Sequence, residues 1–129
     1  MRRFAPAATL VALALSAGLD ARAAAIDRVT AATVAIRCQA GNTPGGFVGT
    51  GVVVNKAGYI LTSTTVVPPK AHDIRVSFQG PRTLPARLVV ADEKLELAVL
   101  KVDAPGEMRL AVMPLGSSDR AAVGQTVVT

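Results

Sequence analysis

The chain has 129 residues and a formal net charge of +5, and its 50% hydrophobic content contains only three Phe, one Tyr and no Trp. That length accommodates one ordinary domain, or part of a larger one, and leaves no room in these residues for a multidomain enzyme. A single Cys cannot form an internal disulfide, and one Cys with one His argues against a zinc site. The basic residues are scattered, with little aromatic interleaving, which argues against nucleic-acid binding.

Residues 1–25 carry the pattern of an export signal. The pair Arg2-Arg3 precedes an uncharged stretch rich in Ala, Leu and Val at residues 4–19. Either Ala21-Arg22-Ala23 or Ala23-Ala24-Ala25 offers the small-x-small pattern that signal peptidase accepts. The uncharged stretch is shorter than the roughly 20 residues of a membrane-spanning helix, so an uncleaved anchor is the weaker alternative. We therefore predict a signal peptide over 1–25, export to the periplasm or the medium, and no stable membrane span after cleavage.

The rest of the chain has the pattern of short strands. One short helix is expected at 24–32, and no later segment keeps a 3.6-residue period. Apolar or alternating runs separated by turn residues predict strands at 33–39, 47–54, 59–65, 73–78, 83–91 and 95–102. Several short strands at regular spacing indicate an antiparallel barrel or sandwich.

Three of these strands also allow a prediction of which faces are buried. In the run at 73–78, the inward face is expected to consist of Ile74, Val76 and Phe78. In the run at 83–91, it is expected to consist of Leu84, Ala86, Leu88 and Val90. The run at 95–102 is almost continuously apolar, which predicts a strand buried on both faces.

Four stretches, taken in order, resemble the amino-terminal half of an HtrA/Deg-type serine protease. The first two are Gly49-Thr50-Gly51-Val52-Val53-Val54 and Gly58-Tyr59-Ile60-Leu61-Thr62-Ser63-Thr64-Thr65-Val66-Val67. The third is Leu95-Glu96-Leu97-Ala98-Val99-Leu100-Lys101-Val102. The fourth is Leu115-Gly116-Ser117-Ser118-Asp119 followed by Val123-Gly124-Gln125-Thr126-Val127-Val128. Each motif alone is weak, but their order and spacing together are more specific.

This resemblance implies an all-β trypsin-like fold, in which two six-stranded antiparallel barrels hold the active site between them. Residues 26–112 would form the first barrel. Residues 113–129 would form the connection to a missing second barrel and the first strand of that barrel. We therefore expect a truncated protease domain, without a cofactor, since the family uses none.

The resemblance also points to the positions of a catalytic triad. Such a site needs a hydroxyl nucleophile, an imidazole base, a carboxylate that orients the base, and an oxyanion hole. The His position is occupied by Thr65 and the Asp position by Glu96, and the Gly-Asn-Ser-Gly-Gly loop of the nucleophile does not occur in the sequence. A threonine hydroxyl cannot act as a general base near neutral pH, and Glu96 is longer by one methylene. We therefore assign no catalytic residue and expect no proteolytic activity.

Other chemistry-bearing residues have simpler structural interpretations. His72 is expected in a solvent-exposed loop, and Cys38 is expected to be a buried, unreactive thiol in its strand. Ser117-Ser118 lacks the surroundings of a nucleophile and predicts a turn. Gly49 and Gly51 are interpreted as close-packing strand residues rather than a phosphate loop. The acidic group at Asp92-Glu93 and Glu96 predicts a solvated turn rather than a metal site.

Two alternatives stay open from the sequence. The chain could be an exported non-enzymatic β-domain that binds a peptide or unfolded protein, with the edge strands of an incomplete barrel accepting an added strand. The weaker alternative is an unrelated small barrel whose resemblance is accidental.

Overall fold

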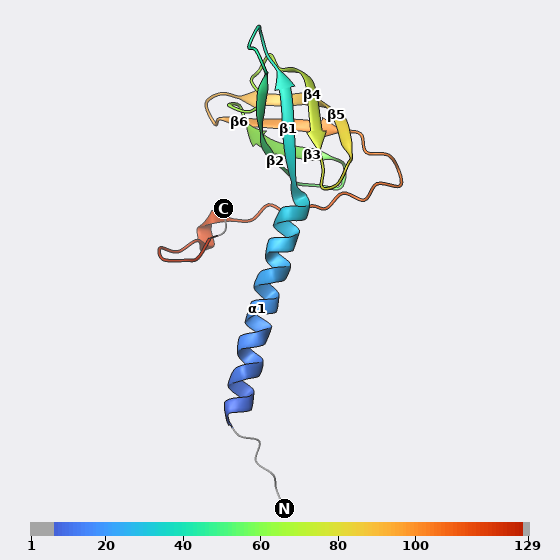
Figure 1. Cartoon of the computed structure of the whole chain (residues 1–129). Coiled ribbons are helices and arrows are strands. Elements are labelled where there is room, and N and C mark those ends of the chain that lie inside the picture. The colour runs from blue at the N-terminus through green and yellow to red at the C-terminus, as the bar shows by residue number, and fades with distance from the viewer. Residues whose placement is uncertain (1–6, 128–129) are drawn as a thin grey trace, which may run out of the picture.

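The chain forms a long N-terminal helix, a small β-barrel and an irregular C-terminal segment (Figure 1). The computed structural model describes residues 7–127, and side chains from residue 18 onward. The Arg2-Arg3 pair of the predicted signal, the first residues of its uncharged stretch and the terminal Val128-Thr129 pair lie outside the described residues.

Helix α1 (Ala7–Ala32) is much longer than the short helix predicted at 24–32. It continues through most of the predicted signal region, because this stretch is dominated by Ala and Leu and has no proline after Pro6. The helix extends away from the barrel as a stalk (Figure 1), and its last residue, Ala32, is buried against the barrel. Within the described residues, no helix combines the length and apolar character that crossing a membrane requires.

Six strands follow, and they close into one barrel. They are β1 (Thr33–Gln39), β2 (Phe47–Val53), β3 (Tyr59–Ser63), β4 (His72–Ser77), β5 (Thr83–Asp92) and β6 (Leu97–Val102). Their order around the barrel is β1-β2-β3-β6-β5-β4, and every neighbouring pair is antiparallel. The expected six-stranded antiparallel barrel is confirmed.

Closure of the barrel corrects the expectation of an incomplete barrel with unpaired edge strands. β1 pairs with β2 on one side and with β4 on the other, so that Ile36 lies opposite both Gly49 and Val76. Each of the six strands therefore has both of its edges paired. The barrel therefore has no strand with a wholly unpaired edge, although β2 pairs with β3 only at Val52 and Val53.

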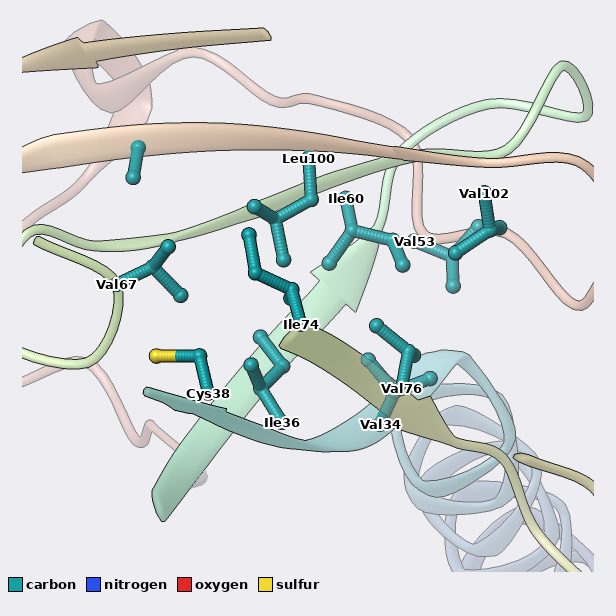
Figure 2. Close-up of a cluster of buried hydrophobic side chains, with 11 residues drawn as sticks. Val34, Ile36, Cys38, Val53, Ile60, Val67, Ile74, Val76, Leu100 and Val102 are labelled. Atoms are coloured by element: carbon teal, nitrogen blue, oxygen red, sulfur yellow. The ribbon is translucent and has the colours of Figure 1, made fainter. Parts of the chain in front are cut away.

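The barrel is filled by small and medium aliphatic side chains (Figure 2). The largest fully buried side chains belong to Ile36, Ile60, Leu100, Val34, Val53, Val67, Val76, Val102 and Cys38. Close approach of the strands depends on glycine at position 51. A Cβ there would lie 2.6 Å from Ile36 Cδ1 and 2.7 Å from Ile60 Cγ2, which confirms the close-packing interpretation.

The inward face of β4 is as predicted, with Ile74 and Val76 buried and Phe78 packed against the core. The prediction for β6 was wrong. Ala98, Leu100 and Val102 are buried, but Leu97 is 41% exposed. A single closed barrel has solvent outside it, so only alternate residues of β6 face the core.

The prediction for β5 was wrong at its far end. Pairing with β6 shifts register between Leu88 and Val90, so Leu88 lies opposite Leu100 and Val90 lies opposite Val99. Such a bulge inserts one residue and reverses which side chains point inward. Val90 is consequently 53% exposed, and Ala91 packs against the core in its place.

The segment after β6 stays attached to the barrel for a short distance. Leu110 and Val112 pack against the core, and Met113 N donates to Val53 O at 2.9 Å. Beyond this point, residues 113–127 contain one 3-10 helix, η1 (Ser118–Arg120), and no strand. Leu115 in this segment is 76% exposed.

Candidate functional site

Thr65 lies in a tight turn directly after β3. The carbonyl oxygen of Ser63 accepts hydrogen bonds from Val66 N at 3.1 Å and from Val67 N at 3.0 Å. Within this turn, Thr65 N donates to Ser63 Oγ at 3.2 Å, and the two hydroxyl oxygens of Ser63 and Thr65 lie 2.9 Å apart. The Thr65 side chain is therefore exposed and hydrogen-bonded to its own turn. These two hydroxyl groups meet at the position that the family resemblance would assign to the histidine.

The barrel interior determines where this turn sits. Val67 is completely buried, and the Cys38 thiol donates to Val66 O at 3.3 Å. Figure 2 shows Val67 and Cys38 close together at one side of the buried cluster. A Cβ at Gly49 would lie 2.4 Å from Val66 Cγ2, so the turn rests directly on β2. The turn is thus held by packing from β1 and β2 beneath it.

Cys38 is a buried thiol, as predicted. Its side chain has no solvent exposure, and burial raises the pKa of the Cys38 thiol because the thiolate loses its hydration. The protonated form donates the hydrogen bond to Val66 O. These features give Cys38 a packing role beneath the turn and keep it from acting as a nucleophile.

Glu96 lies in the turn between β5 and β6. Asp92 Oδ1 accepts hydrogen bonds from Lys94 N at 2.9 Å and from Leu95 N at 3.0 Å, which closes the turn. Glu96 then adopts a left-handed backbone conformation with φ +55°, and its side chain is exposed. Neither of the two ion pairs present in residues 7–127 involves Glu96. The acidic residues here form a solvated turn.

The fold brings the Thr65 and Glu96 turns to the same end of the barrel. Ser63 pairs with Leu97 in the β3–β6 register, and Thr64 N donates to Glu96 O at 3.2 Å. The sequence placed these two residues in separate motifs, and the antiparallel β3–β6 pairing makes them neighbours. Sequence reasoning missed Ser63, which supplies the hydrogen-bond partner of the Thr65 hydroxyl. The sequence feature that could have pointed to Ser63 is its position near the end of a predicted strand, two residues before Thr65.

The remaining candidates lie elsewhere. His72 is the first residue of β4 and is exposed, with its Nδ1 3.1 Å from Asp73 Oδ2. Ser117 caps η1, where its Oγ donates to Asp119 Oδ2 at 3.0 Å and accepts from Asp119 N at 3.3 Å. Across the described part of the chain, no three His, Cys, Asp or Glu side chains gather in a cluster that could hold a metal ion.

Comparison with known proteins shows what this barrel is similar to. Residues 49–129 match the family described as "Trypsin-like peptidase domain". The chain is 46% identical over 80 residues to a probable periplasmic serine endoprotease DegP-like of Hahella chejuensis, an alignment covering 62% of this chain and 16% of that protein. It is 38% identical over 80 residues to the serine endoprotease DegS of Haemophilus influenzae, covering 62% of this chain and 22% of that protein.

A solved structure gives the same result. The crystal structure of the serine endoprotease from Yersinia pestis matches with a TM-score of 0.60 and 35% identity, covering 71% of this chain and 32% of that chain. The chain thus spans well under half the length of the relatives it matches. Agreement of family, relatives and fold excludes an accidental resemblance. The chain belongs to the trypsin-like peptidase domain family, and within it to the HtrA-like proteins.

Proposed function

We propose that these 129 residues form an exported HtrA-like barrel domain that has no peptide-hydrolysing activity of its own. The observation that carries the proposal is the turn after β3, where the Thr65 hydroxyl is bonded to Ser63 Oγ at 2.9 Å at the position that the family resemblance assigns to the base. A hydroxyl there has no basic nitrogen with which to accept the proton of an attacking serine.

The other parts of the machinery support the same conclusion. A carboxylate acts in this chemistry by holding a histidine in the correct orientation. Glu96 is exposed and has no such histidine beside it, since His72 contacts Asp73 instead. The 129-residue sequence also contains no Gly-Asn-Ser-Gly-Gly loop to supply a nucleophile and an oxyanion hole. In subtilisin, removal of the histidine alone lowers kcat by about a millionfold.

Activity-based labelling tests this proposal. The full chain is purified, treated with a fluorophosphonate probe and digested, and the peptides are analysed by mass spectrometry for a modified serine. We expect no labelled serine in the wild-type protein or in the Thr65→His/Glu96→Asp double variant, because restoring base and carboxylate does not create a nucleophile. A labelled serine in the wild-type protein, absent after mutation of that serine to alanine, would contradict the proposal.

Export is proposed from three observations. Residues 1–25 carry the charge and hydropathy pattern of a signal peptide, and the DegP-like relative is named a periplasmic protein. In addition, the side chains of 18–28 are exposed along α1, so this part of the helix contributes little to the barrel. The test is expression in a Gram-negative host with intact-mass measurement of the periplasmic protein. We expect the mass of a protein cleaved after Ala23 or Ala25. An uncleaved product found in the cytoplasm would contradict export.

The second candidate function is binding of a peptide or protein partner without catalysis. Because every strand of the closed barrel has a neighbour on both sides, side chains on its outer surface are better placed for such binding than an added strand. The observation in favour is an unpaired basic surface on two adjacent strands.

A further inference from the structure

β1 and β4 place two arginines directly opposite each other on the outside of the barrel. Arg37 and Arg75 are register partners in this antiparallel pair, and both side chains are exposed. Their neighbours Ile36 and Val76 are fully buried, which confirms that the arginines point outward. Residues opposed in this way have Cβ atoms about 5 Å apart, and like charges at that position destabilise the pair.

Neither arginine has an acidic partner within residues 7–127. The ion pairs of this part of the chain join His72 to Asp73 and Lys101 to Asp103. Asp73, the acidic residue next to Arg75 in β4, has its Oδ2 3.1 Å from His72 Nδ1. The two guanidinium groups therefore form a positive centre that has no salt-bridge partner among the described side chains.

The surface around this centre also offers an apolar side chain and hydroxyl groups, which a peptide could contact. A hollow between the strands is lined by both arginines, by Val48 of β2, and by Ser77 and Thr83. The Val48 side chain is 65% exposed and lies opposite Arg37 in the register of β1 and β2. The hydroxyl oxygens of Ser77 and Thr83 are 2.9 Å apart, so one hydroxyl donates to the other and the second can donate outward.

The extent of the hollow distinguishes a peptide from a small ion. Its lining runs from Val48 on β2 across β1 and β4 to Thr83 on β5, and these four strands are consecutive in the barrel. Strands are spaced about 4.8 Å apart, so the hollow is on the order of 14 Å wide. A single phosphate or acetate ion would cover only the arginine pair.

We propose that this surface, formed by Val48, Arg37, Arg75, Ser77 and Thr83, binds an acidic peptide segment that has an apolar residue beside its carboxylates. The guanidinium groups bind the Asp or Glu carboxylates through charge-assisted hydrogen bonds, and Val48 contacts the apolar side chain. The proposal does not depend on whether the barrel hydrolyses peptides, because the surface contains neither Thr65 nor Glu96.

The test is fluorescence anisotropy with the full chain and two fluorescein-labelled peptides, Gly-Val-Glu-Glu-Val-Gly and Gly-Val-Gln-Gln-Val-Gly. We expect the wild-type protein to bind the glutamate peptide at least about tenfold more tightly than the glutamine peptide. The Arg37→Gln/Arg75→Gln variant should lose this preference. The matched control, Arg87→Gln/Arg120→Gln, removes the same charge from exposed positions on β5 and η1 and should keep it.

Three results would overturn the proposal. Equal affinity for the two peptides would show that the carboxylates are not recognised. Equal weakening by both double variants would show general charge attraction rather than a defined surface. Displacement of the peptide by inorganic phosphate at a concentration near the Kd of the peptide would show a site for small anions. The thermal unfolding of each variant is measured as well. If the Arg37→Gln/Arg75→Gln protein is folded, its loss of binding reflects the missing arginines and not unfolding.

Discussion

The interior of the barrel and the rim that carries Thr65 and Glu96 differ in burial and in what their side chains do. The interior is closely packed around aliphatic side chains that include Ile36 and Leu100, and the six strands around it close into one barrel. At the rim, the exposed Thr65 and Glu96 side chains stand where the family resemblance would put a base and its orienting acid, and the Thr65 hydroxyl is bonded to that of Ser63. The fold depends on burial and strand pairing and the reaction depends on a few rim side chains, so one can persist without the other.

The largest effect should come from the interior. Leu100→Ala removes a fully buried side chain at the centre of β6 and leaves a cavity, so the free energy of unfolding should fall by about 2–5 kcal/mol. Leu115→Ala, at a position 76% exposed, is the control and should change it by less than about 0.5 kcal/mol. Urea denaturation measures both. Equal effects would mean that the barrel is not the stable part of the molecule.

A glycine substitution tests the closeness of strand packing. A Cβ at Gly51 would clash with Ile36 and Ile60, so Gly51→Ala should destabilise the protein by about 1–3 kcal/mol. At Gly106 an added Cβ meets nothing within 4 Å, and Gly106→Ala should be nearly neutral. A tolerated alanine at position 51, measured by thermal melting, would contradict close packing of β2 against Ile36 and Ile60.

Two threonines near the end of β3 compare interior and rim directly. Thr62 is 7% exposed and donates to Thr50 O at 2.7 Å, so Thr62→Val should cost about 1 kcal/mol by leaving that carbonyl without a partner. The Thr65 hydroxyl is exposed, so Thr65→Ala should change stability by less than about 0.5 kcal/mol. A larger loss at position 65 than at position 62 would show that the rim is a structural element.

The smallest effect is confined to alkaline solution and comes from Cys38. Burial raises the pKa of its thiol, so the folded state holds a proton that the unfolded state loses near its ordinary pKa of about 8.5. The stabilisation is complete below that value and is lost as the pH rises through the raised pKa. Urea denaturation between about pH 7.5 and 9.5 should show a steeper loss of stability for the wild type than for Cys38→Ala. Parallel slopes would mean that the thiol is not buried in solution.

The sequence by itself determined the position of nearly every strand. Alternation and turn residues place a strand at 33–39 and an inward face on β4, because period-two patterning is a local property of a half-buried strand. The presence of Thr65 where the resemblance expects a histidine is also visible in the sequence, because a single motif contains that position.

Tertiary structure decided the features that depend on which strands become neighbours. Pairing of β1 with β4 closes the barrel, removes its edges and sets Arg37 opposite Arg75, and nothing local to either arginine indicates the other. The bulge in β5 turns Ala91 inward instead of Val90, because the register of pairing with β6 overrides the local alternation. Long-range hydrogen bonding between strands is the common physical reason, since its partners lie far apart in the chain.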